Sequence, residues 1–459
     1  MVASTPPESS REIYEWLCGF ANLERGQTLR SFNLDRMKIL AEMAGNPEKY
    51  APSIHIAGSK GKGSVTGMIA AILNAAGIKT ARYSSPHVSD FRERLVMGND
   101  FFTEEIYVQA GRELMDIVEK IPSCPNAELF DPNSGNGEMC SFFELMTLWF
   151  FLCARLAHCE AMVVETGMGG RLDATNILDP LVSVITVIEL EHTEYLGTTI
   201  AAVSAEKAGI IKPARPLILA KQTGEALEVF KEHAANKKSP LFYLPDYAEL
   251  KNISLSREGT SFTLILENET LSSLFVPIPG EVQAYNAGLA ILALKTVFPD
   301  ITERNIHEGL SAFTLPARFE RIANKPFIIL DGAHTGRSMD TCLKTFTALY
   351  GKRGILIFGC ASGKNVLSMA KLCVSFFSHI IITTPGTFKK SNPEEIYASF
   401  AKEAEKIYFP PEILLIPDTV EAVNKAINMA SEQELPVLGT GSFYLAAEIS
   451  NIIKLKGMD

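Results

Sequence analysis

The residues with the clearest capacity for chemistry lie between Ser53 and Gly77, in the run SIHIAGSKGKGSVTGMIAAILNAAG. A β-prone run ends at Ala57, a glycine-rich turn with two lysines follows, and apolar residues then recur at helical spacing until Gly77. Glycines let backbone N–H groups point at an anion, a helix N-terminus adds partial positive charge, and a lysine adds a full one. The run therefore predicts a phosphate-binding loop. An αβ turn with incidental glycines is the alternative.

Polar residues also follow other expected strands. Ser84 to His87 form a turn-rich segment, Glu165 to Asn176 follow a buried apolar run, and Glu191 and His192 follow another. Open α/β sheets bind ligands beyond the carboxyl ends of their strands, so these segments are candidates for one site. A solvated loop and a structural histidine are the alternatives for the first and last segments.

The elements that must position these residues follow from periodicity. Residues 13–44 predict two amphipathic helices, with Asn33 as a possible N-cap of the second. Expected strands cover 79–83, 162–164, 181–188 and 217–220, and expected helices cover 103–120, 142–157, 198–209, 224–235 and 280–297. Residues 262–266 and 274–278 alternate with period two, which predicts an antiparallel hairpin.

A second α/β pattern occupies the end of the chain. Expected strands at 327–330, 355–358, 380–383, 413–416 and 436–438 alternate with helical stretches, which predicts a parallel, doubly wound sheet. The segment 315–320 has the irregular composition of a linker. We therefore expect an α/β protein with a P-loop domain over residues 1–318, including N-terminal helices and a hairpin insertion near 260–279, and a smaller Rossmann-like domain over residues 319–459.

Composition limits the function classes. The chain has 459 residues, 47% hydrophobic and 21% charged, and a formal net charge of −10. The charge and the lack of a long basic block argue against nucleic-acid binding. Eight scattered cysteines without C-x-x-C pairs indicate reduced thiols. The N-terminus has no signal-peptide pattern, and the most apolar run, 146–157, is too short to span a bilayer. We expect a cytoplasmic protein without membrane partners.

Taken together, these segments resemble the folylpolyglutamate synthase/dihydrofolate synthase family of the Mur ligase superfamily. The resemblance covers nearly the whole chain. The family's G-T-N-G-K-G-S loop is similar to Gly58–Ser64, with the same short glycine spacing, and its S-P-H loop to Ser85–His87. Its E-x-G-x-G-G-R-x-D-A-T-N run matches Glu165–Asn176, its E-K-A-G-I-I-K run Glu206–Lys212, and its D-G-A-H run Asp331–His334. The order and spacing of these runs make the resemblance specific.

The resemblance implies ATP-dependent amide ligation. A carboxylate of dihydropteroate or a reduced folate takes the γ-phosphoryl group, and the amine of L-glutamate attacks the resulting acyl phosphate. Lysine, magnesium and backbone N–H groups suit this transfer because it brings anions together. We expect a monomer that binds only small molecules, and the pteroyl substrate stays open between dihydrofolate synthase and folylpolyglutamate synthase activity.

The resemblance also implies roles for individual residues. Four residues, named below, match magnesium ligands of the family. One of them, Glu144, has a second interpretation as a first-turn charge that the helix dipole favours. Lys207 matches a lysine that the family carries as a carbamate. His334 lies where it could meet the γ-phosphate or the glutamate, and the catalytic set is Lys62, Lys207 and His334. The nucleotide contacts are Gly58, Gly61, Lys62, Gly63, Ser64, Asn286, Arg318 and Asp331, and the magnesium ligands are Ser64, Ser85, Glu144 and His192.

The chain departs from the family pattern mainly near the expected nucleotide and glutamate positions. Lys60 replaces an asparagine in the phosphate loop and Glu191 replaces an aspartate. Further departures are Ser59, Val282, Ala317, Thr335 and the segment Ser362–Asn365. The departures suggest a catalytically weakened nucleotide-binding protein as one alternative, and a Mur-type ligase with a different carboxylate acceptor is another. The segment before Ser53 is too short for the uridine-nucleotide domain that a cell-wall Mur ligase would need.

Overall fold

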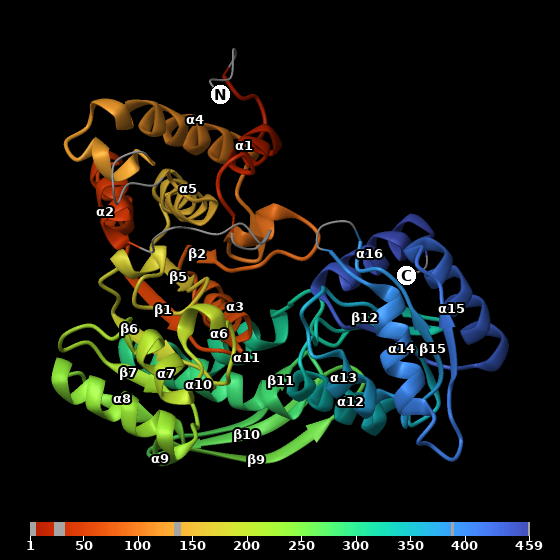
Figure 1. The fold of residues 1–459 in the computed structure, drawn as a ribbon. Coiled ribbons are helices and arrows are strands. Elements are labelled where there is room, and N and C mark those ends of the chain that lie inside the picture. Colours follow the sequence, from red (N-terminus) through yellow and green to blue (C-terminus); the bar gives the residue numbers. More distant parts are fainter. Residues whose placement is uncertain (1–5, 23–32, 133–138, 387–389, 458–459) are drawn as a thin grey trace.

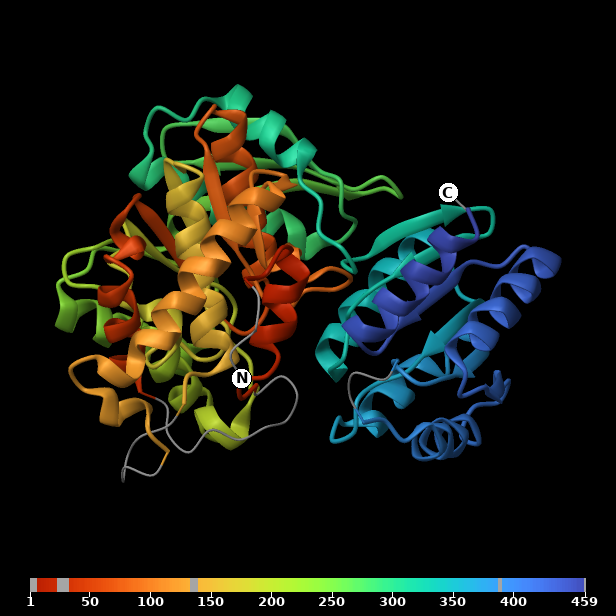
Figure 2. The same cartoon turned by 90° about the horizontal axis from the view of Figure 1, so that it is seen from above.

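The structure is a computed structural model that describes residues 6–22, 33–132, 139–386 and 390–457. Within these residues the strands form three sheets, of eight, three and six strands. Figures 1 and 2 show the eight-stranded sheet with its helices in one body and the six-stranded sheet with its helices in a second body beside it. All eight cysteines lie within the described residues and are free, as expected. The predicted α/β fold is confirmed.

The large sheet brings four strand ends together. Its strands, in sheet order, are β4 (Asp100–Phe101), β3 (Leu95–Met97), β2 (Thr80–Tyr83), β5 (Ala161–Glu165), β1 (Ser53–Ala57), β6 (Val182–Ile185), β7 (Leu217–Leu219) and β8 (Leu241–Tyr243). The neighbours β2, β5, β1 and β6 run parallel, with Ile56 opposite Glu165 and Ala57 opposite Ile185. The segments that follow these strands therefore leave the sheet at the same edge, as the sequence predicts.

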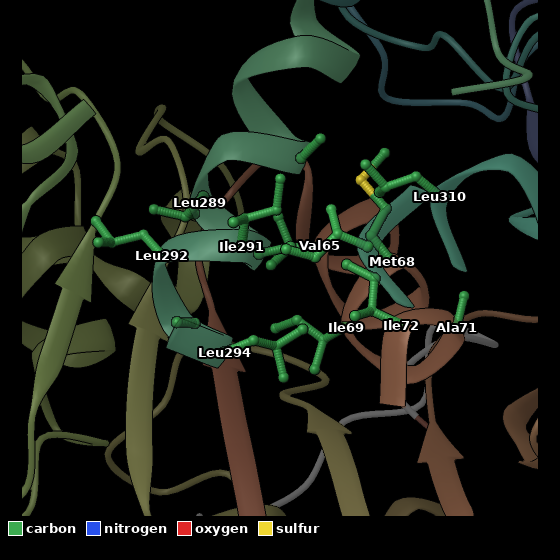
Figure 3. Packing of buried hydrophobic residues seen from close by; sticks show 14 of the residues in the cluster. Val65, Met68, Ile69, Ala71, Ile72, Leu289, Ile291, Leu292, Leu294 and Leu310 are labelled. Carbon is green, nitrogen blue, oxygen red and sulfur yellow. The ribbon is translucent and has the colours of Figure 1, made fainter. Parts of the chain in front are cut away.

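Helix α3 (Lys62–Ala75) carries the phosphate loop and is buried between α10 (Glu281–Val297) and α11 (Glu303–Ala312). Figure 3 shows its apolar side chains facing those of α10 and α11. A Cβ at Gly309 would lie 2.4 Å from the Ile72 Cα atom, so a glycine allows the close contact between α11 and α3. Gly77 follows the helix with φ at +79°, which fits the predicted C′ residue.

Helices on the other face build the N-terminal layer. α1 (Ser10–Leu17), α2 (Leu34–Met43), α4 (Glu104–Lys120) and α5 (Phe142–Leu156) share one apolar cluster. The predicted cap at Asn33 is confirmed, because its side chain accepts a hydrogen bond of 2.7 Å from the Asp35 N–H. The part of the expected helical region at 23–32 lies outside the described residues. α6 (Thr193–Leu196), α7 (Ile200–Ala208), α8 (Gly224–Lys237) and α9 (Leu244–Tyr247) complete this body.

The predicted hairpin is present, and a third strand joins it. β9 (Ala248–Leu255), β10 (Thr260–Leu266) and β11 (Thr270–Val276) form an antiparallel sheet in the order β11-β10-β9. β9 has no clear signal in the sequence because half of its residues are exposed and polar and none is fully buried. The turn between β9 and β10 reaches the second body, as Figure 1 shows, where the Arg257 guanidinium lies 4.8 Å from the Phe327 ring and 4.9 Å from the Tyr350 ring.

All five predicted C-terminal strands are found and run parallel, and a sixth strand that was not predicted joins them at one edge. In sheet order the strands are β12 (Glu320–Asn324), β13 (Phe327–Leu330), β17 (Val437–Thr440), β14 (Gly354–Phe358), β15 (Phe377–Ile382) and β16 (Glu412–Leu415). β12 is an antiparallel edge strand. Its sequence, ERIAN, is too short and polar to be recognised by periodicity. The covering helices are α12 (Gly336–Tyr350), α13 (Val366–Cys373), α14 (Pro393–Ala404), α15 (Thr419–Gln433) and α16 (Phe443–Leu455).

Candidate active site

The phosphate loop is held open by glycines. Gly58 and Gly61 have φ angles of +145° and +92°, which L side chains rarely adopt. A Cβ at Gly58 would lie 1.8 Å from the Thr186 hydroxyl oxygen, and one at Gly61 would lie 2.7 Å from Asn286 Oδ1. Asn286 therefore shapes the loop from α10. The result is a cradle of backbone at the start of α3, as an anion site requires.

Two lysines converge on one carbonyl oxygen of this loop. Lys62 Nζ donates to the Gly58 carbonyl at 2.9 Å, and Lys207 Nζ donates to the same oxygen at 2.8 Å. Lys207, on α7, is 1% exposed and is also 2.8 Å from Glu191 Oε1. Burial lowers the pKa of Lys207 to about 8, although Glu191 opposes the change. Both positive charges thus lie where a phosphate would enter.

The loop after β5 positions Lys207. The Arg171 N–H donates to the Glu206 carbonyl at 2.7 Å, and the two side chains form an ion pair at 2.8 Å. The Asn176 amide donates to the carbonyls of Arg171 and Gly209. These contacts hold the loop against α7. The run 165–176, which resembles a family motif, therefore has a structural role in addition to any direct contact with a ligand.

Glu165 is a site residue to which the sequence analysis gave no role. It ends β5 and is 3% exposed, and its Oε2 has no hydrogen-bond partner within the described residues. A Cβ at Gly63 would lie 3.5 Å from this oxygen, so the carboxylate borders the phosphate loop. Burial raises the pKa of Glu165 to about 7, although Lys62, Arg318 and a hydrogen bond from the Ser85 backbone oppose the rise. A buried carboxylate beside a phosphate loop, with one oxygen free of hydrogen bonds, fits a cation.

The Glu144 carboxylate is engaged by residues of the N-terminal layer. Its carboxylate accepts hydrogen bonds from the Ser141 N–H at 2.7 Å and hydroxyl at 2.8 Å, and the Ser141 hydroxyl accepts one from the Glu144 N–H. This is a capping box at the start of α5. The other carboxylate oxygen is 3.1 Å from Arg36 Nε in a buried ion pair. These contacts support the helix-start interpretation of Glu144, and the magnesium role stays a prediction.

The segment after β2 is an ordered loop. The Ser85–Pro86 peptide bond is cis. The Glu93 carboxylate accepts hydrogen bonds from three consecutive backbone N–H groups, those of Val88, Ser89 and Asp90. Arg94 Nε donates to His87 Nδ1 at 2.8 Å. The sequence alternative of a merely solvated surface loop does not hold for this segment, and the loop places Ser85 against Glu165.

The C-terminal body contributes Arg318, Asp331 and His334. The Arg318 guanidinium lies 4.2 Å from the centre of the Phe443 ring. The Asp331 carboxylate accepts hydrogen bonds from the N–H groups of Phe319 and Ala333, at 2.9 and 2.8 Å. Burial raises the pKa of Asp331, and Arg318 opposes the rise. The two hydrogen bonds to Asp331 order the segment where the chain enters the second body.

His334 is neutral, and its tautomer follows from its contacts. Burial lowers its pKa to about 3, and the charge of Lys60 adds to the effect. His334 Nδ1 lies 2.8 Å from the Gly332 carbonyl oxygen, which can only accept. The proton of the neutral ring is therefore assigned to Nδ1, which leaves Nε2 as a hydrogen-bond acceptor.

An ion pair joins the two bodies at the site. Arg337 Nε, on α12, is 3.1 Å from Glu189 Oε1, and the Ser59 hydroxyl of the phosphate loop donates to the Glu189 carbonyl at 2.9 Å. His192 is exposed and follows Glu191 directly, and Ser64 is buried in the first turn of α3. The Glu189–Arg337 pair therefore places the start of α12 beside the phosphate loop.

The described residues also bear on metals and membranes. Among them, no group of three or more His, Cys, Asp or Glu side chains is arranged to hold a metal ion. Any cation at Glu165 would need hydroxyl, water or substrate oxygens as well. No helix in the described part of the chain combines the length and apolar character needed to cross a membrane.

The fold and the site define a P-loop protein of the Mur ligase superfamily. Residues 143–294 match the Mur ligase middle domain, and residues 317–443 match the Mur ligase glutamate ligase domain. The chain is 29% identical to folylpolyglutamate synthase of Lacticaseibacillus casei, over 90% of this chain and 92% of that protein. It is 29% identical to dihydrofolate synthase/folylpolyglutamate synthase of Bacillus subtilis, over 92% and 95%.

A solved structure gives the same result. Mycobacterium tuberculosis folylpolyglutamate synthase complexed with ADP and AMPPCP has a TM-score of 0.86 and 25% identity, and the match covers 98% of both chains. The chain belongs to the folylpolyglutamate synthase/dihydrofolate synthase family. The resemblance drawn from the sequence motifs is confirmed.

Proposed function

We propose that this chain is an ATP-dependent ligase that joins L-glutamate to the carboxylate of dihydropteroate or a reduced folate through an acyl phosphate. The observation that carries the proposal is the phosphate loop at the edge of the large sheet, with Lys62 on one side and Asp331 to His334 of the second body on the other. The relatives' names, folylpolyglutamate synthase and dihydrofolate synthase, support the substrate class.

In the first step, a carboxylate oxygen of the pteroyl substrate bonds to the γ-phosphorus as the bond to the bridging oxygen breaks, and ADP leaves. The cradle between Gly58 and Ser64 binds and orients the phosphates. Lys62 leaves the Gly58 carbonyl and bonds to phosphate oxygens, which are stronger acceptors because they are charged. Asn286 and Arg318 complete the nucleotide contacts. Holding the oxygens in line and neutralising charge is the main contribution that a protein makes to phosphoryl transfer.

In the second step, the amine of glutamate attacks the acyl carbon, an amide bond forms, and phosphate leaves. The amine must lose a proton. His334 Nε2 is unprotonated, so it can accept a hydrogen bond from the amine and orient it, but its lowered pKa makes it a weak base for removing the proton. Charge from Lys60, Lys364 and Arg318 helps to keep the imidazole neutral, after burial.

The proposal includes Mg²⁺ and replaces one predicted ligand. Glu165 takes the place of Glu144, with Ser64, Ser85 and His192 as the other candidates. The unpaired Oε2 of Glu165 and its contact with Ser85 support this set. When bound, the ion neutralises charge on the phosphate oxygens. Lys207 is proposed as a carbamate site, because the lowered pKa of Lys207 increases the neutral amine that reacts with carbon dioxide.

The remaining assignments are also proposals. We infer that the chain acts as a cytoplasmic monomer and divides into domains at 318/319. The start of β12 at Glu320 supports this boundary. The site between the bodies would then be completed by closure near Arg318.

The test is phosphate release from purified protein with ATP, Mg²⁺ and L-glutamate, with dihydropteroate and tetrahydrofolate added separately. Release with both substrates would assign both activities, and release with one would assign that step. Binding of ATP without release in either reaction would refute the proposal. It would favour another carboxylate acceptor or a weakened site, and a screen of other carboxylates would separate these two.

A further inference from the structure

Lys60 lies in the phosphate loop, and its ammonium group has no fixed partner. Its backbone N–H donates to the Val187 carbonyl at 3.2 Å, which joins the loop to the segment after β6. Within the described residues, no carboxylate lies within 4 Å of Lys60 Nζ and no hydrogen bond from it is found. The proposed function gives this lysine no contact with a substrate.

The carboxylates near Lys60 are already engaged with other cations. Glu189 pairs with Arg337 at 3.1 Å, and Glu191 pairs with Lys207 at 2.8 Å. Burial lowers the pKa of Lys60, and the more distant charges of Glu191 and Glu189 only oppose this change. The positive charge of Lys60 is thus not matched by a carboxylate of its own.

The other groups around Lys60 are cationic or neutral. Lys62 and Arg318 are near enough to repel its charge, and Lys60 in turn acts on His334, which is neutral. Cations from the loop, the linker and the second body therefore lie near one another, while the nearby carboxylates of Glu189 and Glu191 are already paired with Arg337 and Lys207. Like charges gathered in a partly buried region are stabilised when an anion binds among them.

We propose that Lys60 is a second phosphate-binding lysine of this loop and contacts the terminal phosphoryl group of ATP. The inner phosphates lie at the start of α3, where the backbone from Gly61 to Ser64 and the Lys62 side chain bind them. Lys60 precedes the helix and lies on the side of His334 and the Glu189–Arg337 pair, where the terminal group would meet the other substrates. This inference rests on the proposed function and deepens it, because it adds a residue to the phosphoryl-transfer step.

The experiment compares two nucleotides that differ in the terminal group. Calorimetry measures the Kd of ADP and of the non-hydrolysable analogue AMPPCP, with Mg²⁺, for wild type and Lys60→Met. We expect AMPPCP to bind about tenfold more weakly to the variant, the effect of one charge-assisted contact, and ADP to change less than about twofold. Lys60→Arg keeps the charge and should retain most of the AMPPCP affinity.

Two further variants serve as controls. Lys364→Met removes an exposed lysine whose charge also reaches His334, and it should leave both affinities unchanged. Lys62→Met should weaken both nucleotides. Equal weakening of ADP and AMPPCP in Lys60→Met, or no change in either, would overturn the inference. A higher KM for glutamate with unchanged AMPPCP affinity would also overturn it and would place the amino-acid carboxylate at Lys60.

These outcomes are separate from a failure of the proposed function. Nucleotide binding is measured without pteroyl substrate or glutamate, so the Lys60 result does not depend on ligation. If wild type binds AMPPCP but ligates nothing, the proposed function fails while the Lys60 comparison is still decided.

Discussion

Replacing Glu165 by glutamine should stabilise the protein while removing its activity. The side chain is 3% exposed, and one of its oxygens has no hydrogen-bond partner among the described residues. A buried, unpaired carboxylate destabilises a fold, and the amide has nearly the same shape without the charge. Glu165→Gln therefore separates the destabilising effect of this charge from its use in binding a cation.

The magnitude follows from the pKa. In the folded protein the pKa of Glu165 is raised from 4.5 to about 7. Below pH 4.5 the carboxyl is protonated in both states and has no effect on stability. As the pH rises through 4.5 the unfolded chain ionises first, so wild-type stability falls until the pH is well above 7. The free energy of unfolding of the wild type falls by about 1.4 kcal/mol per pH unit, which gives a loss of roughly 3 kcal/mol. Glu165→Gln has no such loss, because its amide does not ionise.

The assay is thermal unfolding between pH 5 and pH 8.5 with EDTA, followed by titration with Mg²⁺. The difference in Tm between Glu165→Gln and wild type should be small at pH 5 and grow to the order of 5 °C at pH 8.5. Mg²⁺ with AMPPCP should raise the Tm of wild type more than that of the variant. Phosphate release by the variant should fall about a hundredfold.

Glu144→Gln is the matched control. The same amide replacement removes the charge that pairs with Arg36 at 3.1 Å, in a pair whose side chains are only 3% and 7% exposed. An unpaired buried guanidinium should lower the stability by about 3–5 kcal/mol. The glutamine can still serve in the capping box. Stability should therefore fall at every pH tested, and the Mg²⁺ requirement of the folded enzyme should stay as in wild type.

Two results would refute this reasoning. If Glu165→Gln had a Tm below that of wild type at pH 8.5, the carboxylate would have a partner that stabilises it without metal. If Glu144→Gln changed the Mg²⁺ requirement at unchanged stability, the magnesium role predicted for Glu144 from the sequence would be restored.

Two further predictions concern the lysines on the Gly58 carbonyl. Lys62→Ala should abolish measurable turnover with a Tm within about 2 °C of wild type, because its hydrogen bond is to a partly solvated loop; unchanged ligation would exclude Lys62 from phosphate binding. Lys207→Ala should lose activity and regain part of it with added formate, which can supply the missing carboxylate of a carbamate. Absence of rescue, with normal folding by circular dichroism, would count against the carbamate.

Much of the fold could be predicted because its signals are local. The apolar spacing of 65–76 and the glycine at 77 define α3, and continuous apolar runs define β1, β5 and the central C-terminal strands. Five strands had no clear signal in the sequence: β3, β4, β8, β9 and β12. They lie at or next to sheet edges, and they are short or carry polar residues. These segments form strands because they pair with a neighbouring strand, and no local sequence pattern predicts that pairing.

The site shows the same division between local and distant signals. The type and spacing of Gly58, Gly61 and Lys62 predicted the phosphate loop. The roles of Glu144 and Glu165 depend on partners elsewhere in the chain, since Arg36 neutralises the first and one oxygen of the second is left without a hydrogen bond among the described residues. A helix-start glutamate and a strand-end glutamate look equally suited to a metal in the sequence. The position of Glu165 at the end of a strand beside β1 was the signal that could have favoured it.

The packing of α3 between α10 and α11 has a consequence for synthesis on the ribosome. About two hundred residues separate the end of α3 from the start of α10, which corresponds to about 10–40 s of translation. During that time the apolar face shown in Figure 3 lacks its native cover. The nucleotide loop therefore cannot reach its final form in a nascent chain that ends before α10, and a truncated protein that stops there would expose this face to aggregation.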